Sequence, residues 1–404
     1  MQMPQFTNPV LDSAFFIHQN SVDVGIPSKG VSSAAKKIYE SMKERQYSTS
    51  TWKTHRLNPK VADENTINWI FLVDLLNFSF WSDLDTVDGT IPHPERYAVK
   101  FDGVRYTGYW SLCACVNRAL QAGIPITSPR YYGYDASDDD LSAVFRSDTQ
   151  EQIPLLEDRI RVMREAGRVL CEVSTTHVVC IKELECRVVC HEELASLVIY
   201  GVERYRTIIR SFAQKFDGNF SNCIRESKQS AMQLIDMVVR EFESFKDEHL
   251  FLGRQVREKC FVNRRISRFA IRNKRACFEG DSFGKFDDID EVTMFADYRV
   301  PLALYHLSAL SYSQRLLDLL HARTPLASSS PEEIEIRGNS IWAVELIRQE
   351  IQQIIDDEHV AEGSHRQKMK VNAILLDFYI WDHAKEIQGK NGTVPAHRTR
   401  SIYY

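Results

Sequence analysis

The chain has 404 residues, of which 44% are hydrophobic and 26% are charged, a composition typical of folded globular proteins and not of disordered ones. Its formal net charge of −5 argues against a protein that coats nucleic acid, because neutralising phosphates needs a surplus of Lys and Arg. Its apolar stretches are far shorter than the roughly 20 residues of a membrane-spanning helix, and its first residues do not resemble a secretory signal. We therefore expect a protein of the cytoplasm, or of the cytoplasm and the nucleus, that has no membrane partner.

Most of the readable periodicity along the chain is helical. Over residues 97–108, apolar residues alternate on both sides of Asp102-Gly103, which predicts a tight β-hairpin. Apolar residues at helical spacing then predict helices within residues 155–170, 228–245 and 344–355. Residues 333–337 (Glu-Ile-Glu-Ile-Arg) alternate in polarity and are a second candidate for a short strand. The predicted fold is mainly α, with a small β-hairpin appendage.

Four clusters of aromatic and acidic residues are spread over about three hundred positions. A carboxylate set among aromatic rings suits a planar, nitrogen-rich ligand, because the rings stack on its face and the carboxylate accepts from its N–H groups. Aromatic runs are also common in protein cores, so the clusters alone do not distinguish a ligand pocket from packing. They lie at residues 77–81 (Asn-Phe-Ser-Phe-Trp), 108–112 (Gly-Tyr-Trp-Ser-Leu), 294–301 (Met-Phe-Ala-Asp-Tyr-Arg-Val-Pro) and 376–382 (Leu-Asp-Phe-Tyr-Ile-Trp-Asp).

These clusters, in this order, resemble those of the queuosine salvage proteins, a family of queuosine 5′-phosphate N-glycosylases. The resemblance runs from about residue 8 to residue 404 and implies a single domain over residues 1–404, interrupted by one insertion. It includes the further stretches 109–120 (Tyr-Trp-Ser-Leu-Cys-Ala-Cys-Val-Asn-Arg-Ala-Leu), 335–338 (Glu-Ile-Arg-Gly) and 402–404 (Ile-Tyr-Tyr). It implies a largely helical fold similar to the helix-hairpin-helix DNA glycosylases, hydrolysis of queuosine 5′-monophosphate to release queuine, and no metal or organic cofactor.

The resemblance also implies the residues of the site. Asp297 matches the catalytic carboxylate, which would stabilise the positive charge that develops on the ribose. Six residues match positions that bind the substrate: His55, Phe295, Asp297, Asp377, Phe378 and Asp382. Each has a plainer interpretation. Asp297 precedes a helix expected to start near Pro301 and could be its N-cap, Asp377 and Asp382 could lie on a solvated helix face, and His55 could be a surface residue.

Two segments depart from the family pattern. Residues 173–211 form an insertion that contains Cys180, Cys186, Cys190 and His191. A zinc site is one interpretation, but the spacing matches no recognised zinc motif, so a surface excursion or an error in the gene model is favoured. Residues 263–275 are unusually basic, where the family has an apolar helix. A local reading-frame slip is one explanation for that segment.

The expected partners are therefore small molecules, namely the nucleotide substrate and the queuine product, without direct binding of nucleic acid. Arg299 and Arg118 are weak candidates for phosphate binding, since a guanidinium fork suits a phosphate dianion. Two alternatives of other classes remain. One is a non-catalytic protein that binds queuine or its nucleoside, and the other is a DNA-repair glycosylase, which the acidic net charge disfavours.

Overall fold

The computed structural model describes residues 6, 8–44, 55–85, 93–172, 216–257, 283, 285–361, 370–387 and 394–404. The insertion at 173–211 and the basic segment at 263–275 lie outside these residues. The structure therefore tests neither the zinc interpretation nor the possible errors in the gene model at these two segments.

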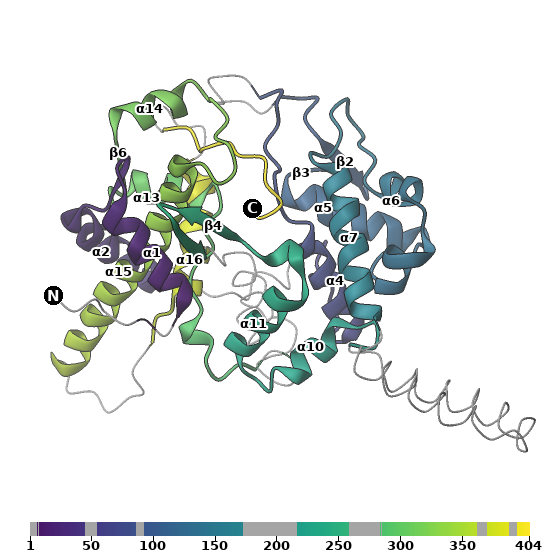
Figure 1. Ribbon diagram of the computed structural model, residues 1–404, viewed down its shortest axis with the longest axis horizontal. Coiled ribbons are helices and arrows are strands. Elements are labelled where there is room, and N and C mark those ends of the chain that lie inside the picture. Colours follow the sequence, from purple (N-terminus) through teal and green to yellow (C-terminus); the bar gives the residue numbers. More distant parts are fainter. Residues whose placement is uncertain are drawn as a thin grey trace, which may run out of the picture.

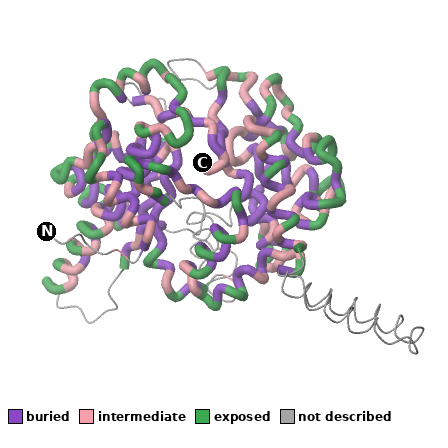
Figure 2. The backbone as a smooth tube through the Cα atoms, in the orientation of Figure 1, coloured by how far each residue is buried: buried purple, intermediate pink, exposed green. Residues whose placement is uncertain are grey.

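The described helices gather in two groups, with the end of the chain between them (Figure 1). The first group contains α4 (Glu64–Leu75), α5 (Tyr109–Gln121), α6 (Asp138–Val144), α7 (Leu156–Cys171), α10 (Phe220–Glu226) and α11 (Ala231–Glu241). The second contains α1 (Pro9–Asn20), α2 (Ser28–Glu44), α13 (Val300–His306), α14 (Gln314–His321), α15 (Pro331–Ala361) and α16 (Ala373–Ile387). Short turns of other helix types lie at Tyr131–Asp135 (η1), Glu243–Phe245 (η2) and Ile289–Glu291 (η4). The buried stretches of the backbone face inward in both groups (Figure 2), and one hydrophobic core contains residues of both.

The strands are short and form three antiparallel pairs among the described residues. The predicted hairpin is confirmed: β2 (Ala98–Phe101) pairs with β3 (Val104–Thr107). Its turn residues Asp102 and Gly103 have φ of 46° and 74°, the left-handed values that such a two-residue turn requires. Two further pairs were not predicted. They join β4 (Glu248–Phe251) to β5 (Arg254–Arg257) and β1 (Val24–Gly25) to β6 (Ser311–Tyr312).

The helix predictions are confirmed, and the structure shows how the chain starts these helices. The stripe within 155–170 is α7, the one within 228–245 is α11, and the one within 344–355 belongs to α15. Local caps define several of the first turns. The Asp63 side chain accepts a hydrogen bond from the Thr66 N–H at the start of α4, and Ser230 does the same for α11.

The strand predicted at residues 333–337 is wrong, because these residues belong to the first turns of α15. Alternation predicts a strand when one face is buried and the other is exposed. Here both sets of residues are buried: Ile334 and Ile336 are 1% exposed, and the charged Glu333 and Arg337 are fully buried. A helix enclosed on all sides shows no amphipathic stripe, so its polarity pattern carries no helical period.

The mainly helical architecture is confirmed, while the similarity to helix-hairpin-helix DNA glycosylases stays a prediction. In the part of the chain that the structure describes, no helix combines the length and the apolar character needed to cross a membrane.

Candidate active site

Asp297 lies in a buried segment that leads into α13. Met294, Phe295, Ala296 and Asp297 are all at most 4% exposed. The Oδ1 atom of Asp297 accepts hydrogen bonds from the N–H groups of Arg299 (2.7 Å) and Val300 (2.9 Å), where α13 begins. The expected helix start near Pro301 is thus confirmed, and the carboxylate does satisfy the first N–H groups of that helix. A capping contact and a catalytic role are compatible, because a helix N-terminus holds a carboxylate in a fixed position.

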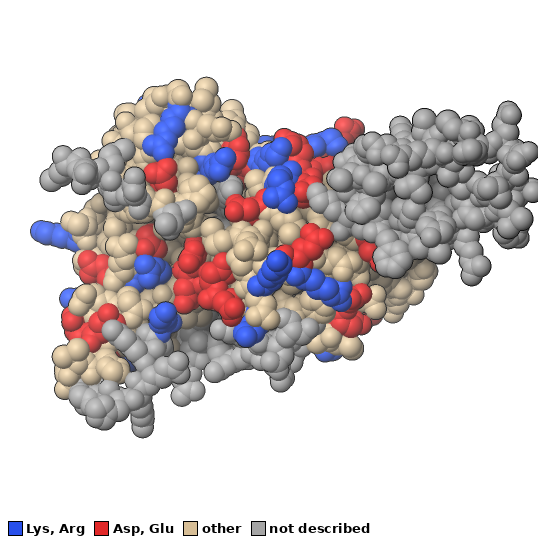
Figure 3. All heavy atoms as spheres, turned by 60° about the horizontal axis from the view of Figure 1, so that its bottom comes forward, with Lys and Arg blue, Asp and Glu red and all other residues tan. Residues whose placement is uncertain are grey.

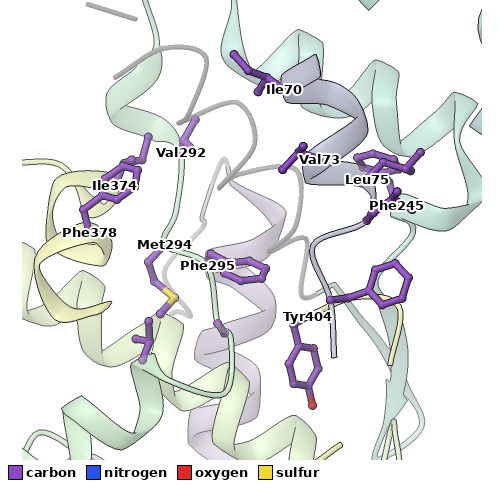
Figure 4. Close-up of a cluster of buried hydrophobic side chains, with 14 of the residues drawn as sticks. Ile70, Val73, Leu75, Phe245, Val292, Met294, Phe295, Ile374, Phe378 and Tyr404 are labelled. Atoms are coloured by element: carbon purple, nitrogen blue, oxygen red, sulfur yellow. The ribbon is translucent and has the colours of Figure 1, made fainter. Parts of the chain in front are cut away.

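The aromatic rings next to Asp297 are part of the core. Phe295 and Phe378 are 2% and 7% exposed and belong to the same hydrophobic cluster. Figure 4 shows Phe295 directed to the side of Val73 and Tyr404, whereas Phe378 and Ile374 from α16 lie on the other side of Met294. Two of the predicted substrate-binding residues thus lie close to Asp297 along this part of the core: Phe295 within the same segment and Phe378 beside Met294.

The two acids of α16 have different surroundings. Asp377 is 2% exposed and follows Leu376 on the buried side of the helix, which packs against α13 and α15. Asp382, five residues later, is exposed. Its neighbour Trp381 is half-buried, with the ammonium of Lys385 3.4 Å from the centre of the indole ring. A buried carboxylate beside α13 is well placed to accept from a ligand in the core, whereas Asp382 could reach one only from the rim.

His55 stacks on an aromatic side chain of the second cluster. Its ring lies 3.5 Å from that of Trp110, centre to centre, at an angle of 15°. Trp110 is in the first turn of α5 and packs against the main core together with Tyr109. The His55 Nδ1 atom accepts from the Leu57 N–H at 3.3 Å. The half-buried imidazole is thus fixed against an aromatic face and does not have the surroundings of an ordinary surface histidine.

The two arginines considered for phosphate binding have different roles. The guanidinium of Arg118 donates to the carbonyls of Val144 (3.3 Å) and Arg146 (2.7 Å) and pairs with Asp148 (3.2 Å), so it fixes the loop after α6. Arg299 adjoins Asp297. Burial alone would lower the pKa of Arg299, but the nearby Tyr298 and Asp297 outweigh it and raise that pKa above its usual value. Of these two arginines, Arg299 is therefore the one that places a positive charge beside the predicted catalytic carboxylate.

The sequence analysis missed a group of buried charged residues behind this segment. Arg337 and Asp247 are fully buried and form an ion pair, and Glu333 pairs with the same guanidinium at 3.2 Å. The one signal in the sequence was the i, i+4 spacing of Glu333 and Arg337, which the strand interpretation hid. Among the described residues, no three His, Cys, Asp or Glu side chains are grouped as a metal site would require.

Comparisons with known proteins identify the family of the chain. The family model described as "Queuosine salvage protein" matches residues 57–207 and 200–404. A protein of Schizosaccharomyces pombe named queuosine 5′-phosphate N-glycosylase/hydrolase is 38% identical over 98% of this chain and 99% of its own. Proteins of the same name from Mus musculus and Sphaerobacter thermophilus are 36% and 31% identical, over 97% and 92% of this chain and 98% and 91% of theirs. The chain therefore belongs to the queuosine salvage protein family.

Proposed function

We propose that this protein hydrolyses the N-glycosidic bond of queuosine 5′-monophosphate and releases queuine. Relatives named queuosine 5′-phosphate N-glycosylase/hydrolase match nearly the whole chain, which supports this assignment. The structural observation that supports it most is the buried Asp297, whose carboxylate accepts two backbone N–H groups. In the sequence, Asp297 lies between the aromatic residues Phe295 and Tyr298. Phe295, Asp377 and Phe378 are proposed to bind the base, with His55 and Asp382 at the edge of the site.

The chemistry follows from the charge of the transition state. When the bond between base and ribose breaks, positive charge builds up on the sugar, and a carboxylate close to the anomeric carbon stabilises that state more than the neutral ground state. The same carboxylate can align or activate the attacking water. Asp297 does not move freely, because its Oδ1 atom is tied to the start of α13. Its charge therefore needs little reorganisation when the bond breaks.

The test is the Asp297→Asn variant, which keeps the size of the side chain and an oxygen that can accept the two N–H bonds. We expect turnover, measured as release of queuine by chromatography, to fall by about 10²-fold or more, while the variant stays folded and binds queuine.

The matched control is Asp63→Asn, since Asp63 also accepts a backbone N–H (Thr66, 2.8 Å) at a helix start but lies at α4. If both variants lose stability equally and keep wild-type turnover, Asp297 is only a cap. If the wild-type protein binds queuine but releases none from the nucleotide, it is a binding protein and not an enzyme.

The substrate is proposed to be the nucleotide and not the unphosphorylated nucleoside. Arg299 supplies a half-buried cation beside Asp297, and a guanidinium forms charge-assisted hydrogen bonds with phosphate oxygens. We expect a higher kcat/KM for queuosine 5′-monophosphate than for queuosine, and we expect Arg299→Met to reduce that difference. Equal kcat/KM for the two substrates in the wild-type protein would show that it has no phosphate site.

The distribution of charge on one face of the molecule favours a free nucleotide over a polynucleotide. On the face shown in Figure 3, basic and acidic side chains of the described residues are intermixed, and no broad basic area is seen. Binding to a nucleic-acid backbone would need such an area. We therefore propose that the protein acts on the released nucleotide and does not bind tRNA or DNA directly.

A further inference from the structure

A buried network of charged residues contacts the segment that carries Asp297. At its centre is Arg337, a fully buried residue of α15. Its guanidinium pairs with both oxygens of Asp247, which follows η2, and its Nη1 lies 3.2 Å from Oε1 of Glu333. Burial alone would raise the pKa of Asp247, but the charge of Arg337 and the hydrogen bonds from His249 and Arg337 lower it below its usual range.

Tyr404 and His249 add further contacts to the network. The Tyr404 hydroxyl donates to Glu333 Oε1 at 2.8 Å, and the Tyr404 ring lies 4.4 Å from the guanidinium carbon of Arg337. His249 bridges Asp247 (2.9 Å) and the Ser329 hydroxyl (2.7 Å). Three segments that are distant in the sequence thus meet at one side chain, and a charged group buried this completely keeps its position only if all of these partners stay in place.

One bond connects this network to the site. The Nε atom of Arg337 donates to the carbonyl oxygen of Ala296 at 3.2 Å. The N–H of the same peptide group, which belongs to Asp297, donates to the Phe295 carbonyl at 3.1 Å. Both polar groups of the peptide between Ala296 and Asp297 are therefore engaged, so its plane is fixed. The direction of the Asp297 side chain depends on that plane.

We propose that Arg337 is a positioning residue for Asp297: held by Asp247, Glu333 and Tyr404, it fixes the peptide that precedes the carboxylate. The inference rests on the proposed function, in which Asp297 acts on the ribose. A carboxylate displaced by about 1 Å is a much weaker catalyst, since misplacements of that size cost on the order of 10²-fold in rate. Of the residues proposed to bind the base, only Phe295 adjoins the peptide that Arg337 holds, whereas Asp377 and Phe378 come from α16. We therefore expect base binding to depend less on Arg337 than turnover does.

The test compares Arg337→Lys with a matched control on the same helix. Lysine keeps the positive charge but loses the planar fork and the Nε donor to Ala296. The control is Glu335→Gln, which alters another buried carboxylate of α15 that accepts the N–H groups of Val22, Asp23 and Val24, away from Ala296. Each variant is measured in the full-length protein by hydrogen exchange of the peptide that covers residues 292–300, by kcat and KM, and by queuine affinity.

We expect Arg337→Lys to exchange faster in residues 292–300 and to lose kcat by about tenfold or more, with a much smaller change in queuine affinity. Glu335→Gln should lower the melting temperature and leave hydrogen exchange in residues 292–300, kcat and queuine affinity at their wild-type values. Unchanged exchange in Arg337→Lys overturns the positioning role, whatever its activity. Faster exchange in a protein whose wild type releases no queuine instead means that the proposed function has failed while the positioning role stands.

A more conservative substitution tests the proposal if Arg337→Lys does not fold. Tyr404→Phe removes only the hydroxyl that donates to Glu333, and it keeps both the ring beside Arg337 and the carbonyl that accepts from the Ser79 N–H at 2.9 Å. Exchange in residues 292–300 and kcat should change in the same directions as for Arg337→Lys, by smaller amounts. Wild-type values of both in folded Tyr404→Phe would overturn the proposal.

Discussion

Asp377 and Asp382, both proposed to bind the base, have different surroundings although they lie on the same helix. Five residues on an α-helix turn the side-chain direction by about 140°, and the structure accordingly buries Asp377 and exposes Asp382. A buried carboxylate that accepts a hydrogen bond from a ligand contributes more than an exposed one, because water competes for the exposed group. The contributions of the two acids to base binding should therefore be unequal.

The corresponding prediction concerns the affinity for queuine. Asp377→Asn should weaken binding by about tenfold or more, since a hydrogen bond to a charged group contributes about 1.5–3 kcal/mol. Asp382→Asn should weaken it less. Calorimetric titration of queuine measures both, with Asp139→Asn on the exposed surface of α6 as a control for the loss of one charge. A larger loss for Asp382 than for Asp377, or none for either, would remove these residues from the base site.

At the scale of elements, the sequence predicted most where one face of an element is buried. The hairpin at β2 and β3 and the helices α7 and α11 have regular polarity patterns, and Asp102-Gly103 has the turn chemistry that its φ values need. The residues of the candidate site come from the family resemblance and stay a prediction, to which the structure adds their burial and contacts. The network behind the site could not be predicted, because Asp247, Arg337 and Tyr404 are far apart in the sequence and only the tertiary packing pairs them.

The insertion allows a prediction at the same scale. The Gly218 N–H donates to the Leu170 carbonyl at 2.9 Å, so the chain on both sides of the undescribed residues 173–215 is already joined in the structure. Deleting residues 173–211 should therefore leave the fold intact, because a shorter connection between ends that lie close together costs little free energy. Circular dichroism and a melting curve measure the outcome, and elemental analysis of the full-length protein measures zinc. Loss of folding on deletion, together with bound zinc in the intact protein, would contradict this prediction and favour the Cys and His site.

At the scale of the whole molecule, residues 394–404 join the two helix groups. The Trp81 indole N–H donates to the Thr399 carbonyl (3.0 Å), and the Leu326 N–H donates to that of Arg398 (2.8 Å). His397 lies within this segment and is 3% exposed. Burial and the charge of Arg337 lower the pKa of His397 from 6.5 to about 3. The folded protein therefore keeps this imidazole neutral at a pH at which the unfolded chain takes up a proton.

This difference predicts how stability depends on pH. Because the folded-state pKa of His397 lies below the unfolded one, its contribution is fully present above pH 6.5 and is lost progressively as the pH falls toward 3. One such group changes the free energy of unfolding by at most about 1.4 kcal/mol per pH unit. Urea unfolding of wild type and His397→Gln measures it. Burial also lowers the pKa of His383, which acts in the same direction, so only the difference between the two proteins is assigned to His397. Parallel pH profiles of the two proteins would show that His397 does not contribute.

The packing of α1 and α2 against α15 has a consequence for how the chain is made. Glu335, whose carboxylate accepts the N–H groups of residues 22–24, is synthesised about 300 residues after them. β6, the pairing partner of β1, is synthesised almost as long after β1. At roughly 5–20 residues per second, the ribosome needs roughly 15–60 s to supply these partners. During that time α1 and α2 lack their α15 partner, although β5 can cover part of α1 before α15 is made, while α4 to α7 can already pack together. We therefore expect the contact between Ala296 and Arg337, which orders the segment with Asp297, to form late in folding, once α15 has been synthesised.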